Sequence, residues 1–184
     1  PEKVFEAIIK PEVARRYWGH ENVSDWRPGS RWQHVRDNEQ RTVNLVGEVI
    51  ENTPPSRLVI SWANESEAAD PRAYSRVTFD IEPYDDMVRL TVTHDDLVVG
   101  SGMEIGVTKG WPVVLSSMKS YLETGRGLRA GNEGLWWAEE VQLIQDAVLT
   151  LQADEVVEAF RIAQCFLQSQ PGSCLPHPVD FEGT

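Results

Sequence analysis

The sequence predicts an α+β fold, in which a curved antiparallel sheet wraps round one long helix and an added C-terminal helical segment follows. Strand-like alternation of apolar and polar residues recurs in five consecutive segments between residues 30 and 94. Short connections separate these segments, which favours an antiparallel meander over βαβ units. After residue 102 the apolar spacing becomes helical and stays so to residue 124.

Two short helices open the chain. Val4, Phe5 and Ile8 lie at helical spacing within residues 2–10. Pro11 suits the first turn of a second helix, which we expect to run through Trp18. The strands then follow, separated by turn signals such as Pro28-Gly29 and Pro54-Pro55. We expect them at 30–36, 43–51, 58–62, 77–81 and 90–94.

The long helix is expected over 103–124 and ends at Gly125. Trp111, Leu115 and Met118 lie on its apolar stripe. Pro112 costs little only in the first turn of a helix, so we expect a break near Gly110 that leaves 103–109 as a separate turn or lid.

We divide the chain into a main domain at 1–127 and a helical extension with an irregular tail at 128–184. The extension carries long apolar stripes, the second of which ends at Leu167. These stripes must be covered, because a monomer rarely exposes so much apolar surface. Either they fold back on the domain, or they form a homodimer through residues 134–168, which we slightly favour.

Charge restricts the partners. The net charge of −12 and the pI of about 4.7 disfavour nucleic acid and anionic membrane surfaces. No run of 18 apolar residues predicts a membrane-spanning helix. Two cysteines near the end of the chain are most simply free thiols, so we expect a cytoplasmic protein.

Several short runs match one known family in order. Across 2–125 the chain resembles the activators of heat-shock-protein-90 ATPase homologues, within the SRPBCC/START-like superfamily. The resemblance implies a helix-grip fold for 1–127, a bacterial source, and a cavity for an apolar molecule between the sheet and the long helix. The matching runs are R-P-G-S-R-W at 27–32, G-E-V-I-E at 47–51, P-P-S-R-L at 54–58, L-T-V-T-H at 90–94 and G-W-P at 110–112.

The predicted cavity would be lined by inward-facing residues of the strands and of the long helix. An apolar space with a few polar groups is a common ligand site, and aromatic walls suit a ring-containing ligand such as a polyketide. The rival interpretation is that the same side chains only fill a close-packed core. The candidates are Trp32, His34, Leu45, Ile60, Trp62, Phe79, Val92, His94, Trp111, Leu115 and Met118.

Catalytic signals are few. The four histidines lack metal-ligand spacing, and no phosphate-binding loop, dinucleotide motif or nucleophile elbow occurs. We therefore assign no catalytic residue, metal or cofactor. His34 and His94 either orient a ligand or act as an acid or base, or are ordinary hydrogen-bonded histidines.

Three functions stay open at this point. The first is binding of an apolar small molecule (a lipid, polyketide or aromatic natural product), including capture of a reactive one for self-resistance. The second is a co-chaperone-like module that contacts a heat-shock-protein-90-type ATPase. The third is a cyclase- or dehydratase-type enzyme that uses the same pocket, which would need at least two polar groups deep within it.

Overall fold

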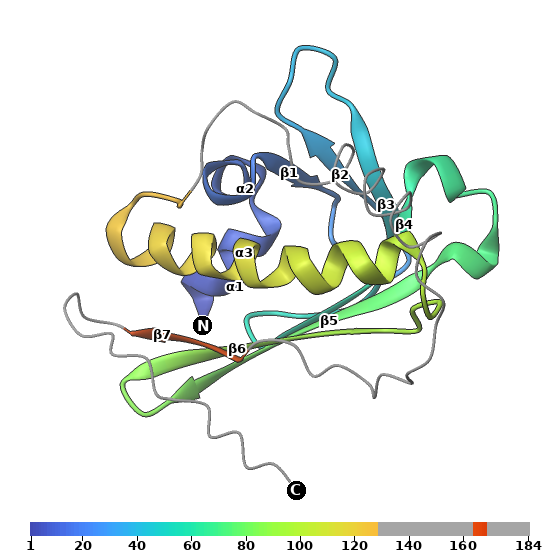
Figure 1. The fold of residues 1–184 in the computed structure, drawn as a ribbon. Coiled ribbons are helices and arrows are strands. Elements are labelled where there is room, and N and C mark those ends of the chain that lie inside the picture. Colours follow the sequence, from blue (N-terminus) through green and yellow to red (C-terminus); the bar gives the residue numbers. More distant parts are fainter. Residues whose placement is uncertain (129–163, 169–184) are drawn as a thin grey trace, which may run out of the picture.

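The structure is a computed structural model that describes residues 1–128 and the strand at Gln164–Gln168 (Figure 1). A meander of strands forms one curved sheet, and the longest helix lies along its concave face. This arrangement is the predicted helix-grip fold. The elements are α1 (Glu2–Ile9), α2 (Pro11–Trp18), β1 (His20–Val23), β2 (Arg31–Arg36), β3 (Val43–Thr53), β4 (Arg57–Asn64), the 3₁₀ turns η1 (Glu65–Glu67) and η2 (Pro71–Ala73), β5 (Ser75–Tyr84), β6 (Met87–Asp95), α3 (Gly102–Thr124) and β7 (Gln164–Gln168).

The sheet follows chain order from β1 to β7, and every neighbouring pair is antiparallel. Register shifts occur between His34 and Val35 and between Val49 and Glu51. Such bulges bend a strand and increase its twist, which helps the sheet curve round α3. Gly47 lets β3 approach its neighbours closely, because a Cβ there would lie 1.9 Å from the Ser61 carbonyl oxygen.

Helix α3 runs without interruption through Pro112, so the predicted break near Gly110 is wrong. The helix begins instead at a cap: Ser101 Oγ accepts from the Glu104 amide at 3.1 Å. The Glu104 carboxylate in turn accepts from the Gly100 amide at 2.6 Å. Burial of Val107, Trp111 and Leu115 on both sides of the proline stabilises the helix enough to tolerate it.

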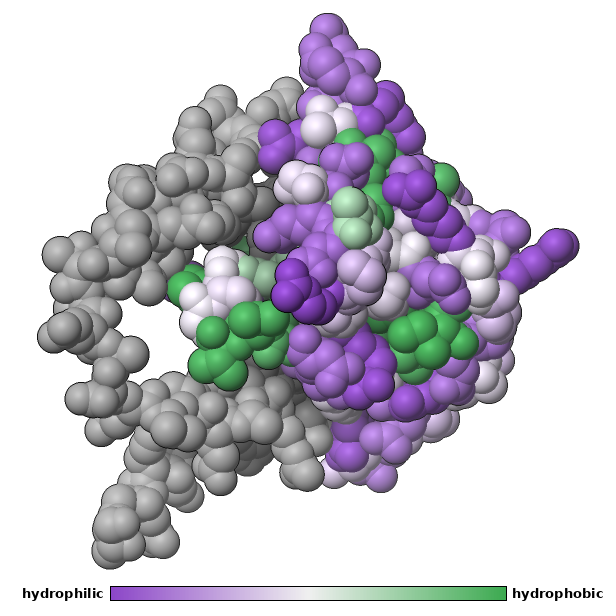
Figure 2. All heavy atoms as spheres, turned by 90° about the vertical axis from the view of Figure 1, so that its right-hand side faces the viewer, coloured by the Kyte–Doolittle hydropathy of each residue, from purple (hydrophilic) through white to green (hydrophobic). Residues whose placement is uncertain are grey.

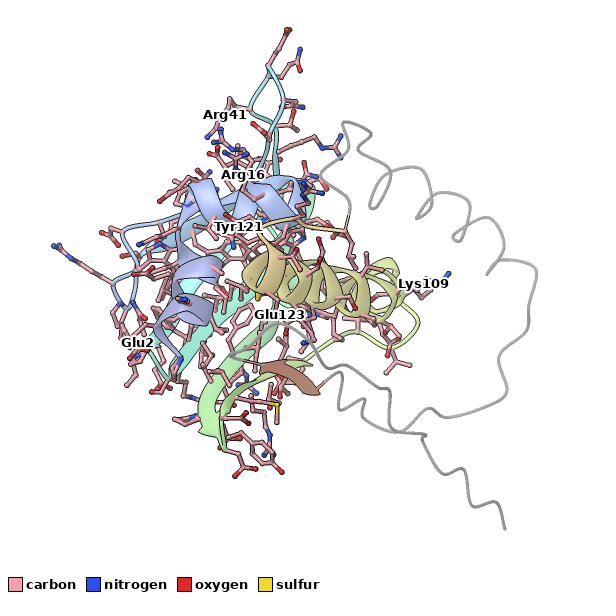
Figure 3. All side chains as sticks on the ribbon, turned by 90° about the vertical axis from the view of Figure 1, so that its left-hand side faces the viewer. Glu2, Arg16, Arg41, Lys109, Tyr121 and Glu123 are labelled. Carbon is pink, nitrogen blue, oxygen red and sulfur yellow. The ribbon has the colours of Figure 1, made fainter. Side chains whose placement is uncertain are left out.

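One end of the grip is closed by α1 and α2. Figure 3 shows these helices beside α3, with Tyr121 between α2 and α3. The Tyr17 hydroxyl donates to the Ala7 carbonyl at 3.1 Å, and Ser117 Oγ donates to the Tyr17 carbonyl at 2.8 Å. The two short helices are thereby fixed to each other and to α3.

Two strands were not predicted. One is β1, and the other is β7, which lies where the second helical stripe was expected to end at Leu167. At Gln164–Gln168 the helical prediction is therefore wrong, because the backbone pairs with β6 instead. The rest of the extension, including most of the dimer segment 134–168, lies outside the described residues. In the part of the chain that the structure describes, no helix is both long and apolar enough to cross a membrane.

Candidate functional site: a cleft above an aromatic cluster

An open cleft of about 850 Å³ lies at the end of the molecule opposite α1 and α2. Its walls come from the β2–β3 hairpin, the η1–η2 connection, the β6–α3 loop and the first turn of α3. Figure 2 shows this end of the molecule, where hydrophobic areas interrupt a mainly hydrophilic surface. Val98 lies in the cleft wall and is 61% exposed, which gives the opening an apolar edge.

The charged side chains of the cleft are mostly acidic. Two guanidinium groups line it, against four carboxylates, so the lining carries a formal charge of 2 − 4 = −2. Arg72 is paired with Asp70 at 2.9 Å, and its hydrogen bond holds the pKa of that carboxyl below its usual value. The cleft therefore repels anions, as does the whole chain. The charged lining residues are Arg36, Arg72, Glu65, Glu67, Asp70 and Asp96.

The residues that the sequence predicted to line the cavity are all buried. The structure brings them together between the sheet and α3, where the apolar ones form one continuous core. His34 and Leu45 also line the open cleft, whereas the others pack beneath it. For these others, the role of cavity lining stays a prediction.

Trp62 is the centre of a buried aromatic cluster that includes His34, one of the residues lining the cleft. Its ring centroid lies 5.1 Å from that of Trp32, 5.7 Å from that of Trp111 and 5.6 Å from that of His94. Trp18, at the C-terminal end of α2, joins the cluster 5.6 Å from Trp111. Such pairs add about 0.5–1.5 kcal/mol each beyond their buried area, so the cluster also holds the helices on the sheet.

His94 is held within a complete chain of hydrogen bonds. The Trp111 indole N–H donates to His94 Nδ1 at 3.2 Å, so Nδ1 carries no proton. His94 Nε2–H then donates to Ser75 Oγ at 2.8 Å, and Ser75 donates to the Trp62 carbonyl at 3.0 Å. Burial lowers the pKa of His94 from 6.5 to about 4, although the charge of Asp95 opposes this shift. His94 is thus neutral at pH 7, and both of its ring nitrogens are engaged.

His34 differs from His94 because only one of its two ring nitrogens has a hydrogen-bond partner among the described residues. Asn22 donates its amide N–H to the Ile8 carbonyl at 2.8 Å, so its oxygen is the atom that faces His34. That oxygen lies 2.6 Å from His34 Nδ1 and accepts the proton there. His34 Nε2 is therefore an unprotonated acceptor, and among the described residues it has no hydrogen-bond partner although it is buried.

His20 stacks on His34 with nearly parallel rings, 4.4 Å apart at 8°. Its Nδ1–H donates to the Trp18 carbonyl at 3.2 Å, and Asn44 lies 3.4 Å from its Nε2. Burial lowers the pKa of both imidazoles, and the charge of His20 lowers that of His34 further. Both rings are neutral at pH 7, which keeps Nε2 of His34 an acceptor.

Three more buried nitrogens near His34 have no partner within the described part of the chain: Nε1 of Trp18, Nε1 of Trp62 and Nε of Arg36. Each is a donor. Buried polar atoms without a partner are rare in folded proteins, so this group is unusual. The sequence did not indicate Trp18, His20 or Arg36 as site residues. Arg36 alone could have been predicted, because it alternates with Trp32 and His34 on β2.

The site offers nitrogen atoms for hydrogen bonding rather than a metal centre. Within residues 1–128 no group of three or more His, Cys, Asp or Glu side chains is arranged to hold a metal ion. The stacked rings of His20 and His34 lie face to face, so their nitrogens do not converge on one point. The arrangement can contact a small molecule through the His34 imidazole and the other polar side chains that line the cleft.

Comparison with known proteins identifies the family. The family model "Activator of Hsp90 ATPase homolog 1-like protein" matches residues 1–123. The chain belongs to this family. The match covers the helices and strands that build the cleft, and it ends at the last turn of α3.

Solved structures similar to this family member share its fold. CalU16 from Micromonospora echinospora is 21% identical over 82% of this chain and 81% of its own, with a TM-score of 0.50. The Aha1 dimer from Colwellia psychrerythraea is 20% identical over 69% and 90%, with a TM-score of 0.57. MLL2253 from Mesorhizobium loti is 22% identical over 66% and 88%, with a TM-score of 0.55. A search of curated proteins found no match.

Proposed function

We propose that this protein binds a neutral, ring-containing small molecule in the open cleft. The observation that carries the proposal is a cleft of about 850 Å³ whose lining includes His34, the ring that joins it to a cluster of packed tryptophans. Ligand pockets commonly measure about 300–1,000 Å³ and combine apolar walls with a few placed polar groups. The acidic lining favours a neutral ligand over an anionic one. We expect this binding to take place in the cytoplasm.

Binding accounts for the site better than cyclase- or dehydratase-type catalysis does. The enzyme hypothesis relied on His34 and His94 acting together in one pocket. His94, however, uses both ring nitrogens for Trp111 and Ser75 and does not line the cleft. The co-chaperone hypothesis has the family name in its favour, but no surface in the described residues favours it over binding.

A fluorescent dye and a filled cleft test the proposal. N-phenyl-1-naphthylamine is neutral and aromatic, and we expect it to bind with micromolar affinity. Met103, in the cleft wall on the first turn of α3, offers the blocking variant Met103→Trp. The control is Lys109→Trp on the same helix, since Lys109 is exposed and projects outward (Figure 3).

We expect Met103→Trp to weaken dye binding at least fivefold and Lys109→Trp to leave it unchanged. Equal affinity in both variants would show that the cleft is not the binding site. Filling the core instead, through Leu115→Phe or Met118→Trp, is less informative, because each side chain is only 2% exposed and overpacking typically costs about 1–3 kcal/mol of stability.

We also propose that the 184-residue chain forms a homodimer through residues 134–168. The apolar stripes of this segment need covering, and one structural neighbour is described as a dimer. Light scattering of the full chain at tens of micromolar should give twice the mass of 20.8 kDa. A monomer at that concentration would refute this assembly and leave the ligand proposal unaffected.

A further inference from the structure

Arg36 differs from the other partly buried arginines in the part of the chain that the structure describes. Arg15, Arg57 and Arg89 each form an ion pair with a carboxylate, at 3.1–3.3 Å. Arg36 is also partly buried, but it forms an ion pair with none of the described residues, and its Nε has no hydrogen-bond partner among them. A guanidinium group that is partly withdrawn from water without a counter-ion is uncommon in a folded protein.

The position of Arg36 makes its guanidinium group a candidate for contact with a ligand. Arg36 is the last residue of β2 and lines the cleft, as does His34 two residues earlier on the same strand. The other guanidinium group of the cleft belongs to Arg72, which donates two hydrogen bonds to Asp70, at 3.0 and 2.9 Å. Of these two cations, Arg36 is therefore the one whose donors are not already used within the described fold.

The chemistry of Arg36 determines the group that it can bind. A guanidinium group only donates hydrogen bonds and keeps its charge at every physiological pH, so it needs an acceptor. An anionic acceptor is disfavoured here, because the lining of the cleft carries a formal charge of −2. A carbonyl oxygen is a neutral acceptor with two lone pairs, and it brings no donor that would need a partner of its own.

We infer that Arg36 donates hydrogen bonds to a carbonyl oxygen of the ligand, which is then a neutral aromatic carbonyl compound such as a ketone, a quinone or an amide. This inference rests on the proposed binding function and names the class of ligand for the same cleft. The ring of the molecule contacts the apolar part of the lining, which includes Leu45, Leu97 and Met103.

The experiment compares 2-acetonaphthone with 2-isopropenylnaphthalene, in which a CH₂ group replaces the carbonyl oxygen and the planar shape is kept. Equilibrium dialysis at pH 7 against the 184-residue chain gives a dissociation constant for each probe. The hydrocarbon is the more hydrophobic of the two, so the informative quantity is the ratio of the two constants and its change between variants.

Arg36→Met removes the guanidinium group and keeps a long side chain, and Arg72→Met is the matched control. Each substitution removes one positive charge from the lining of the cleft. We expect Arg36→Met to lower the preference for the ketone about tenfold, near the lower end of what a hydrogen bond to a charged group contributes. Arg72→Met should leave the preference unchanged.

A measurement on the wild type covers the case in which Arg36→Met fails to fold. In the ¹H–¹⁵N spectrum of the arginine side chains, 2-acetonaphthone should shift the Nε–H signal of Arg36 more than 2-isopropenylnaphthalene does. The corresponding signal of Arg72 should respond equally to the two probes, since its guanidinium group is bound to Asp70.

The outcomes separate this inference from the binding function on which it rests. A preference for the ketone that is the same in all three proteins, or an Arg36 signal that does not distinguish the probes, would overturn the inference. An equal loss in Arg36→Met and Arg72→Met would do so too, because the net charge of the cleft and not a contact with Arg36 would then set the preference. In each of these cases the probes bind and the binding function stands. It also stands, without the inference, if N-phenyl-1-naphthylamine binds and neither probe does. If the dye and both probes fail to bind, both fail.

Discussion

Acidification from pH 7 to pH 5 should destabilise the native protein through His94. This histidine is buried and neutral in the fold, where its pKa is about 4 instead of 6.5. Below pH 6.5 the unfolded chain binds a proton at this position and the native protein does not. The unfolded state therefore binds more protons in this window, and the free energy of unfolding falls as the pH falls.

The magnitude follows from the two pKa values. The full difference corresponds to about 3 kcal/mol, reached only at a pH below 4. Between pH 7 and pH 5 the loss due to His94 is about 2 kcal/mol. His20 and His34 act in the same direction, since burial lowers their pKa values too. The wild type should therefore lose more than 2 kcal/mol in total.

A variant isolates the contribution of His94. His94→Gln removes the titrating ring but keeps a side chain that can accept from Trp111 and donate to Ser75. Urea unfolding of both proteins at pH 7 and pH 5 gives four free energies of unfolding. We expect the pH-dependent loss to be about 2 kcal/mol smaller in His94→Gln than in the wild type.

Measurements between pH 7.5 and pH 8.5 serve as the control, because no histidine with a lowered pKa titrates there and the two proteins should show the same dependence. An equal loss of stability from pH 7 to pH 5 in both proteins would refute the reasoning. It would mean that His94 gains its proton in the fold as easily as in the unfolded chain, and that the chain from Trp111 to Trp62 is not the native arrangement.

Two substitutions and one control variant test the packing around the site, all by chemical denaturation at pH 7. Gly47→Ala should cost about 3 kcal/mol through overpacking and the loss of a hydrogen bond to the Ser61 carbonyl, where the new Cβ would lie. The control Gly29→Ala places its Cβ where no atom lies within 4 Å, so it should cost about 1 kcal/mol for its positive φ alone. If Gly47→Ala and Gly29→Ala cost the same free energy of unfolding, the close approach at Gly47 would be contradicted. Trp111→Ala should cost about 3–5 kcal/mol, and an unchanged midpoint would show that this ring, 3% exposed, does not support the core.

The strands of the sheet could be predicted from the sequence where one face is apolar. Leu58, Ile60 and Trp62 alternate along β4, and all three are buried. The pattern is local, because a strand with one buried face repeats every two residues. The helix α3 could also be predicted from a local pattern, its apolar stripe. Its continuity through Pro112 could not, because it depends on packing against residues distant in the sequence.

β1 was missed because its buried residues are polar. His20, Glu21 and Asn22 are all buried, and each is satisfied by a partner distant from it or on another element. Glu21 lies 2.7 Å from Arg41 of the β2–β3 hairpin, which is labelled in Figure 3. That hydrogen bond is the main cause of the lowered pKa of Glu21. A polar strand of this kind looks like a loop until its partners are known.

The two candidate histidines look alike in the sequence, since each alternates with apolar residues on a strand that faces α3. Their partners distinguish them. His94 meets a donor and an acceptor, so its hydrogen bonds are complete and its role is structural. His34 meets only the acceptor Asn22, and its second nitrogen faces no partner in the described fold. His34 also lines the cleft, whereas His94 does not. For these two reasons we place recognition of the ligand at His34 rather than at His94.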